Sequence, residues 1–290
     1  MRIRLLLAAL IAAIALPAAA QPRTAGDLRV MAFNVRLPLA SDGPDHWPNR
    51  RDHLIDTLRD ADADIIGTQE LHKAQGDYIV RRLPLYAWFG IGRRGGRDDE
   101  HMGIFFRRDR LRVVDLGNFW LSETPQVPGS ISWGHPYPRM VTWGLMERIA
   151  DGKRFYLLNT HFAYRGEDVE ARRSMAEAIA AHVETLPADV PVVVTGDFNA
   201  TPEEPAYAIL TAGLADAWTA TENRSGPEGT FHGFKGKADR RIDWLLSRGF
   251  DMRAAWTIAE ARRGRYPSDH FPVVADLRFQ LPHPPSVRPE

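Results

Sequence analysis

The 290-residue chain contains no cysteine. This absence excludes disulfide bonds, a thiolate metal site and a cysteine nucleophile. Noncovalent packing therefore has to hold the folded chain together. With 290 residues, 44% of them hydrophobic, the chain is long enough to bury a large core without covalent cross-links.

The chain also lacks an excess of either charge, because 37 Asp and Glu residues balance its 37 Lys and Arg residues. A protein that binds long nucleic acid gains much of its affinity by neutralising phosphates and is usually strongly basic. The balance favours a small or short substrate without excluding a nuclease, since local patches matter more than the total. Basic residues do cluster at 93–112, 235–241 and 262–265, and they would steer an anionic substrate if they flanked one cleft.

Long hydrophobic runs are missing as well. The run at residues 5–16 is shorter than the ~20 residues that a membrane-spanning helix needs. Arg2 and Arg4 precede this run and three alanines follow it at 18–20, a pattern typical of a secretory signal that is cleaved near Ala20. We therefore expect residues 1–20 to be removed and the mature chain to be periplasmic or secreted, with no membrane anchor.

Hydrophobic residues alternate between the period of a strand and the period of a helix, which predicts α+β or mixed α/β structure. No Ser/Gly-rich linker divides the pattern, so we expect one domain from about residue 27 to residue 279. Residues 281–290 carry four prolines and are predicted to be disordered. The pattern predicts helices at 47–61, 72–82, 166–184 and 204–210, and strands at 28–35, 64–68, 86–91, 102–107, 111–121, 141–149, 155–162, 192–195, 242–246, 253–259 and 271–279.

A long loop is predicted at residues 122–139, which hold four prolines and two glycines between two strands. Loops of this length are often functional. Its aromatic residues Trp133, His135 and Tyr137 have two interpretations. They either stack on a base or a sugar, or they pack the loop against the sheet.

Polar residues follow or open several of the predicted apolar strands, where a rigid scaffold can present reactive groups. Taken singly, each has a structural explanation as a cap, a turn residue or a core hydrogen-bond partner. A carboxylate directly after a buried strand, however, must be hydrated, paired or bound to a metal. The set comprises Asn34, Glu70, His161, Asp197, Asn199, Asp243, Asp269 and His270.

This inventory of carboxylates, amides and histidines is suited to chemistry at phosphorus. Hard oxygen ligands suit Mg²⁺, with Mn²⁺ as an alternative, and the sequence has no His-x-x-x-His or cysteine pair for a zinc site. Displacement at phosphorus requires neutralised oxygens, an activated water and a stabilised leaving oxygen, and such a set can supply all three. The sequence contains neither a Walker-type phosphate loop nor a Gly-x-Ser-x-Gly elbow.

At these residues the chain resembles the endonuclease/exonuclease/phosphatase superfamily, in particular a bacterial exported subgroup whose substrates are undefined. The resemblance implies the DNase I-like fold, a four-layer α/β (α+β) sandwich of two packed mixed β-sheets flanked by helices. The motifs occur in family order along nearly the whole mature chain. They are Phe-Asn at 33–34, Gln-Glu at 69–70, Asn-Thr-His-Phe at 159–162, Gly-Asp-Phe-Asn at 196–199, Arg-Ile-Asp-Trp at 241–244 and Ser-Asp-His-Phe-Pro-Val at 268–273.

The same resemblance implies a metal site at one end of the sandwich. Glu70 would be the principal Mg²⁺ ligand, with Asn34 beside it and Asp269 as a further ligand or water-positioning group. Arg139 stands where some members of the family place an arginine that contacts phosphate. It could equally be an ordinary loop arginine.

Five further residues would carry the catalytic roles that the resemblance implies. Asp197 would orient or deprotonate the attacking water, and Asn199 would position Asp197 and the phosphate. His161 and His270 would hydrogen-bond the phosphoryl oxygens. Asp243 would hold His270 in the required tautomer.

We therefore expect a monomeric, metal-dependent hydrolase of phosphate esters that acts through a metal-activated water. The first interpretation is a phosphodiesterase or nuclease acting on nucleic acid, a nucleotide or another phosphodiester. The alternative is a phosphomonoesterase of the same fold that acts on a small phosphorylated molecule, and a third is an inactive binding module. A monoesterase needs cations for a dianion, whereas a diesterase needs room for a second substituent.

Overall fold

The structure of the protein is a computed structural model, and it describes residues 24–280. The predicted signal segment and the proline-rich segment at 281–290 lie outside the described residues. Within the described part of the chain, no helix combines the length and the apolar character that crossing a membrane requires.

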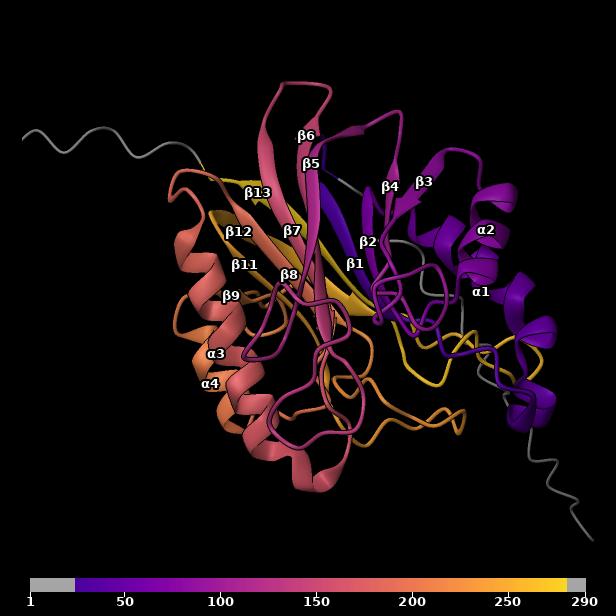
Figure 1. Cartoon of the computed structure of the whole chain (residues 1–290). Coiled ribbons are helices and arrows are strands. Elements are labelled where there is room, and N and C mark those ends of the chain that lie inside the picture. Colours follow the sequence, from indigo (N-terminus) through magenta and orange to yellow (C-terminus); the bar gives the residue numbers. More distant parts are fainter. Residues whose placement is uncertain (1–23, 281–290) are drawn as a thin grey trace, which may run out of the picture.

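Two mixed β-sheets pack face to face in the centre of the molecule (Figure 1). The seven-stranded sheet has the order β10 (Arg224–Ser225), β12 (Phe250–Thr257), β13 (Val273–Phe279), β1 (Leu28–Asn34), β2 (Ile65–Gln69), β4 (Ile104–Arg107) and β3 (Tyr86–Phe89). The six-stranded sheet has the order β5 (Leu111–Trp120), β6 (Met140–Arg148), β7 (Arg154–His161), β8 (Val192–Asp197), β11 (Asp243–Arg248) and β9 (Ala215–Asp216).

Helices cover the outer face of each sheet and complete four layers. Helices α1 (Trp47–Ala61) and α2 (Lys73–Arg82) lie beside the seven-stranded sheet, and α3 (Val169–Thr185) and α4 (Pro205–Thr211) lie beside the six-stranded sheet (Figure 1). Two short 3-10 helices, η1 (Ala40–Asp45) and η2 (Gly166–Asp168), precede α1 and α3. This arrangement is the DNase I-like sandwich that the resemblance implied.

The alternation of side chains along the central strands explains why these strands are apolar on both faces. In β1, Val30 and Ala32 belong to the apolar cluster between the two sheets, while Met31 and Phe33 belong to the cluster under α1 and α2. A third cluster fills the space between the six-stranded sheet and α3 and α4. Because successive residues of a strand point to opposite faces, a strand in the middle of four layers has no solvent face.

Near one end of the sandwich, polar contacts replace apolar packing between the sheets. The Asn159 side chain in β7 donates to the Thr68 carbonyl in β2 at 2.7 Å. Its Oδ1 accepts from Gln69 Nε2 at 2.7 Å and from Thr195 Oγ1 at 3.0 Å. Gly67 lies against this network. Motif residues 69 and 159 therefore join the sheets below the polar strand ends.

The predicted helices and long strands are present, with boundaries shifted by a few residues. The segment predicted as one helix at 166–184 is divided into η2 and α3. The short strands β9 and β10 were missed, because two residues are too few to establish a period.

We predict that Gly67→Ala lowers stability by about 3 kcal/mol, the upper range for an overpacked core. An added Cβ would lie 2.0 Å from Thr195 Oγ1 and 2.6 Å from Asn159 Oδ1, so the sheets would have to separate. Thermal and urea unfolding measure the loss. Gly213→Ala is the matched control, because nothing lies within 4 Å of its added Cβ. Equal stability of the two variants would contradict this account of the sheet contact.

Candidate active site

The register of the two sheets brings the polar strand ends together. Strands β1 and β2 run parallel, so Asn34 and Gln69 are paired at their carboxyl ends, and Glu70 follows immediately. Strands β7 and β8 are also parallel and pair His161 with Asp197. Strand β11 is antiparallel to β8 and begins with Asp243 opposite Asp197. The carboxyl ends of four strands and the start of a fifth therefore lie at one edge.

Asn34 links the two sheets at this edge. Its Nδ2 donates to Glu70 Oε1 at 3.1 Å and to Asp197 Oδ2 at 2.9 Å. Its Oδ1 accepts from the backbone N–H of Arg36 at 3.0 Å. These contacts make Asn34 a bridge between two carboxylates, and its predicted role as a metal ligand stays a prediction.

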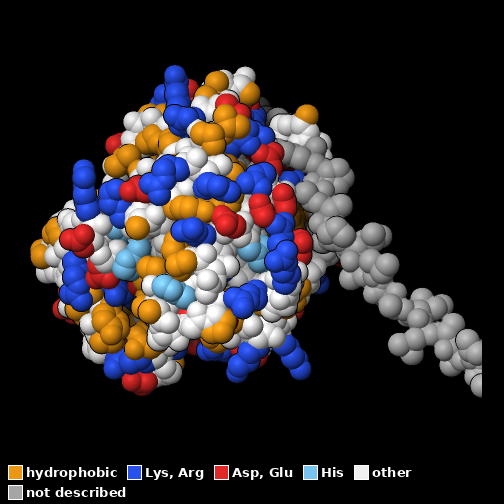
Figure 2. Space-filling view, turned by 90° about the vertical axis from the view of Figure 1, so that its right-hand side faces the viewer, with side chains coloured by type: hydrophobic (Ala, Val, Ile, Leu, Met, Phe, Trp, Pro, Cys, Tyr) orange, Lys and Arg blue, Asp and Glu red, His pale blue; other side chains and the backbone are white. Residues whose placement is uncertain are grey.

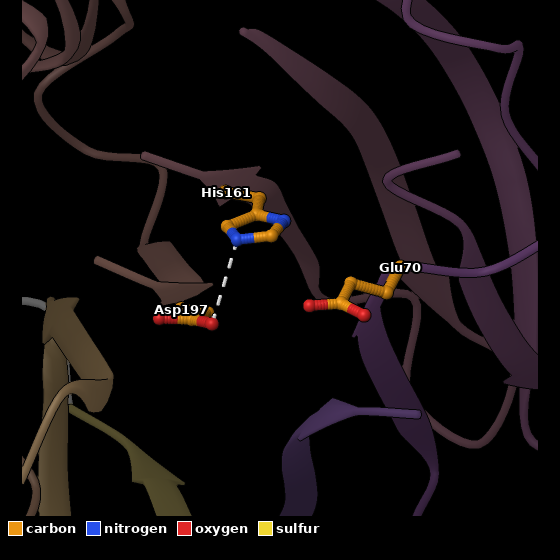
Figure 3. A group of neighbouring side chains, drawn as sticks. All are labelled: Glu70, His161 and Asp197. Carbon is orange, nitrogen blue, oxygen red and sulfur yellow. Dashed lines mark ion pairs between the residues drawn. The ribbon is translucent and has the colours of Figure 1, made fainter. Parts of the chain in front are cut away.

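Glu70, His161 and Asp197 form a group that fits a divalent cation. One ligand atom from each residue lies within 4.8 Å of the other two. Figure 3 shows the three side chains converging on one space, and His161 Nε2 lies 3.5 Å from Asp197 Oδ2. Glu70 has a φ of 57°, and the backbone N–H of Leu37 donates to its Oε2 at 3.0 Å. Two carboxylates and an imidazole are an ordinary donor set for a divalent ion.

The electrostatic environments of the Glu70 and Asp197 carboxylates differ. Burial raises the pKa of Glu70 above its ordinary value, and the negative charges of Asp269 and Glu100 raise it further. Burial also acts to raise the pKa of Asp197, but the positive fields of His270 and His161 outweigh it and leave that pKa lowered. Asp197 is therefore held as a carboxylate, while the negative charge around Glu70 would be relieved by a bound cation.

His270 and Asp243 form a buried ion pair next to Asp197. His270 Nδ1 lies 2.8 Å from Asp243 Oδ2, and Nε2 lies 3.7 Å from Asp197 Oδ2. Burial alone would lower the pKa of His270, but the charges of Asp243 and Asp197 raise it to about 10. The imidazole is thus a buried cation near neutral pH, and Nε2 is the nitrogen left to face a substrate.

The remaining predicted residues lie around this centre. The backbone N–H of Asn199 donates to Asp197 Oδ1 at 3.0 Å, and its side chain donates to the Phe162 carbonyl at 3.2 Å. Asp269 is buried, with Oδ2 3.5 Å from Arg36 Nη1. Arg139 is buried as well, so it is not an ordinary exposed loop arginine. The structure brings all nine predicted residues together, and their individual roles stay predictions.

Glu100 belongs to the site but is absent from the residues that the sequence predicted. Its Oε1 lies 2.6 Å from His161 Nδ1 and 3.5 Å from Arg139 Nη1. Burial acts to raise its pKa, but His161, Arg139 and Arg93 outweigh it and hold the pKa well below the ordinary range. Glu100 therefore fixes the tautomer of His161. The missed signal is an acidic residue just before the buried strand β4.

Arg36 was also missed. Its guanidinium forms a two-point ion pair with Asp42 and lies 3.5 Å from Asp269 Oδ2 and 3.8 Å from Glu70 Oε2. Buried Arg50 fixes this loop by donating to several carbonyls, including those of Arg36 at 2.8 Å and Pro267 at 2.8 Å. The sequence held a signal for Arg50, since this arginine falls within the apolar stripe of the helix predicted at 47–61.

A cleft of about 620 Å³ opens over the site. Four guanidinium groups line it, those of Arg36, Arg93, Arg139 and Arg240. Three aromatic rings also line it, those of Tyr137, Tyr164 and Phe231. The cleft therefore brings four guanidinium groups and three aromatic rings together with four carboxylates, those of Glu70, Glu100, Asp197 and Asp269.

The basic clusters of the sequence divide between this cleft and ordinary surface ion pairs. Arg107 and Arg110 pair with Asp62, and Arg262 pairs with Asp56. The face drawn in Figure 2 shows basic, acidic and apolar side chains interspersed over the surface. Only part of the basic clusters therefore contributes to the cleft.

Comparison of the chain with known proteins identifies its family. The model of the Endonuclease/Exonuclease/phosphatase family matches residues 31–270, so the chain belongs to this family. The fold, the family and the buried carboxylate and histidine site together define the protein as a metal-dependent phosphoester hydrolase.

The chain is also similar to individual known proteins. A family member from Bacteroides thetaiotaomicron is 32% identical, with a TM-score of 0.83 over 88% of this chain and 98% of that one. A mannosyl-6-phosphatase from the same species is also 32% identical, with a TM-score of 0.82 over 87% of this chain and 100% of that one. Protein L388 of Acanthamoeba polyphaga mimivirus is 29% identical over 163 residues, 53% of this chain and 59% of the viral protein. The match thus spans less than two thirds of that relative.

We predict that Asp243→Asn lowers the pKa of His270 by roughly one to three pH units, the usual effect of a close opposite charge. The His270 pKa is raised in the folded protein, so the ion pair stabilises the fold fully below about pH 6.5 and loses its contribution as the pH rises through about 10. NMR titration of the histidine rings in the metal-free protein measures the change. The His53 signal is an internal control, with a pKa lowered to about 4 by burial and by Arg262. An unchanged His270 titration would refute the electrostatic coupling.

Proposed function

We propose that the protein is a metal-dependent phosphomonoesterase that acts on a small phosphorylated molecule, with a sugar phosphate as the best-supported substrate class. The observation that carries this proposal is the set of cationic groups gathered around the acidic centre of the cleft. Four arginines and the imidazolium of His270 face the same space as the metal-binding group. This order reverses that of the sequence analysis, which ranked a phosphodiesterase first.

The charge of the substrate explains why the lining favours a monoester. A phosphate monoester carries a charge of about −1.5 to −2 near neutral pH. A diester carries one negative charge and needs space for a second substituent. Arg36 and Arg139 lie close to the acidic centre, within 3.8 Å of Glu70 and 3.5 Å of Glu100 respectively. These cations suit the doubly charged group.

Similarity to the Bacteroides mannosyl-6-phosphatase supports the same proposal independently. That protein matches this chain over 87% of its length at 32% identity, with full coverage of the relative. A mannosyl-6-phosphatase removes phosphate from a mannosyl group. Its likeness therefore supports a monoester and, more specifically, a phosphorylated sugar.

The residues supply the parts that the reaction requires. Glu70 would hold the cation, for which we propose Mg²⁺ because carboxylate oxygens dominate the group that Glu70 forms with Asp197 and His161. When bound, the cation polarises the phosphoryl group and lowers the pKa of water. Asp197, kept ionised by its histidine neighbours, accepts the proton of the attacking water.

The histidines and arginines would stabilise the charge that develops on the phosphoryl oxygens. Protonated His270 presents Nε2 as a donor, because Asp243 occupies Nδ1. His161 is oriented in the same way by Glu100. Donors that are fixed before the reaction need no reorganisation when charge develops. These histidines and arginines thus serve both binding and turnover.

We also propose export to the periplasm or outside the cell, on the amino-terminal sequence pattern alone.

We predict that p-nitrophenyl phosphate is hydrolysed with a kcat/KM about tenfold or more above that for bis(p-nitrophenyl) phosphate, because the monoester engages more of the cationic groups. Both reactions are followed by p-nitrophenolate release with Mg²⁺, with Mn²⁺ and with EDTA. EDTA should abolish turnover of the monoester. Preferential cleavage of the diester would return the phosphodiesterase interpretation to first place.

We predict that Glu70→Gln weakens Mg²⁺ binding at least about tenfold, because it removes an anionic ligand. Asp197→Asn should retain most of the binding and lose turnover, because it removes the proton acceptor. Calorimetric titration and steady-state rates measure the two properties separately. Glu184→Gln, at an exposed position of α3, makes the same change away from the site. A fully active Asp197→Asn variant would rule out its assigned role.

A further inference from the structure

Two exposed tyrosines extend the cleft beyond the phosphate-binding groups. Tyr137 is 38% exposed and Tyr164 is 53% exposed. Their ring centroids lie 6.3 Å apart and their planes differ by 29°. Both line the same cleft as Glu70, His161 and Asp197. Aromatic rings exposed in this way can pack against a ligand.

The chain connects these rings directly to the reacting centre. Tyr164 follows His161 by three residues, and Tyr137 precedes buried Arg139 by two. The loop aromatics of the sequence analysis thus separate into two kinds. Trp133 packs against the apolar cluster beneath α3, and His135 is buried, whereas Tyr137 remains open to the cleft. The interpretation of the loop as packing holds for the first two residues and not for the third.

Arg93 adds a directional donor to this surface. Its guanidinium carbon lies 4.8 Å from the centroid of the Tyr137 ring. Its Nε and Nη1 donate to Asp99 at 3.1 Å and Glu100 at 2.8 Å. Within the described residues, Nη2 makes no hydrogen bond, so it is the donor available to a ligand. Of the five N–H groups of the guanidinium two are engaged, so Arg93 keeps donors for a ligand hydroxyl, those of Nη2 among them.

We infer that Tyr137, Tyr164 and Arg93 form a glycosyl subsite that holds the sugar ring of the substrate. A pyranose ring presents an apolar C–H face, which packs on aromatic rings, and hydroxyl groups, which need separate hydrogen-bond partners. A nucleobase is a poorer fit, because its edge is read by paired donors and acceptors such as those of Asn and Gln. Of the cleft-lining residues only Asn199 has a side-chain amide, and that amide already donates to Phe162.

This inference rests on the proposed function only for the phosphate group of the substrate. The test therefore uses ligands that carry no phosphate. Saturation-transfer NMR is recorded with methyl mannoside and with adenosine. The wild-type protein should transfer signal to methyl mannoside. Tyr137→Ala and Tyr164→Ala should lose most of it, and Tyr137→Phe, which keeps the ring, should retain it. Tyr78→Ala is the matched control, since Tyr78 also carries an arginine against its ring, at 4.9 Å, but does not line the cleft.

Kinetics give a second measurement of the same subsite. Tyr137→Ala should lower kcat/KM for mannose 6-phosphate by roughly tenfold, the effect of one aromatic contact, and leave glycerol phosphate nearly unchanged. Equal losses on both substrates would mean that the tyrosine only supports the fold. Signal transfer to adenosine in place of methyl mannoside would overturn the glycosyl subsite. Signal transfer to methyl mannoside that does not depend on Tyr137 would overturn it as well. Sugar binding without monoester hydrolysis would overturn the proposed phosphatase activity and leave the subsite standing.

Discussion

The contact between the two sheets at one end of the sandwich is the constraint on which the site depends. Asn34 and Glu70 come from the seven-stranded sheet, and His161 and Asp197 come from the six-stranded sheet. Asn159 bridges the sheets directly below them, and Gly67 leaves the space that the bridge needs. Because one Asn34 amide group reaches both carboxylates, the spacing of the sheets also sets the spacing of the metal-binding group.

Because this group is buried, its charges have to balance one another closely. An isolated buried charge is costly, so each charged group needs a partner of opposite sign. Asp243 meets His270, Glu100 meets His161 and Arg139, and Asp197 meets both imidazoles. Glu70 has Arg36 at 3.8 Å, but its neighbours Asp269 and Glu100 add negative charge, and its pKa stays raised. A divalent cation would complete the balance at the position where the chemistry requires one.

The residues that line the cleft, more than the metal-binding group, distinguish between the activities that such a site can perform. The carboxylates and histidines suit hydrolysis of any phosphate ester, so they define the class of reaction. In the function that we propose, the surrounding arginines would act on the charge of the phosphate and the exposed tyrosines on the group attached to it. Substrate choice therefore lies in loops and strand ends outside the metal-binding group, where a rigid scaffold tolerates variation.

The sequence by itself determined the mixed α/β composition and the positions of the long elements, and its resemblance to a known family implied the layered architecture and the nine residues of the predicted site. Local periodicity carries the first two, because burial on two faces leaves a readable pattern, and ordered motifs carry the resemblance. The tertiary structure alone decided where Glu100, Arg36 and Tyr137 lie relative to the site. Each is a loop residue whose environment is built by segments distant in sequence, as when Glu100 meets His161 across 61 positions. Neither periodicity nor motif spacing encodes such contacts, since they arise only when the sheets pack.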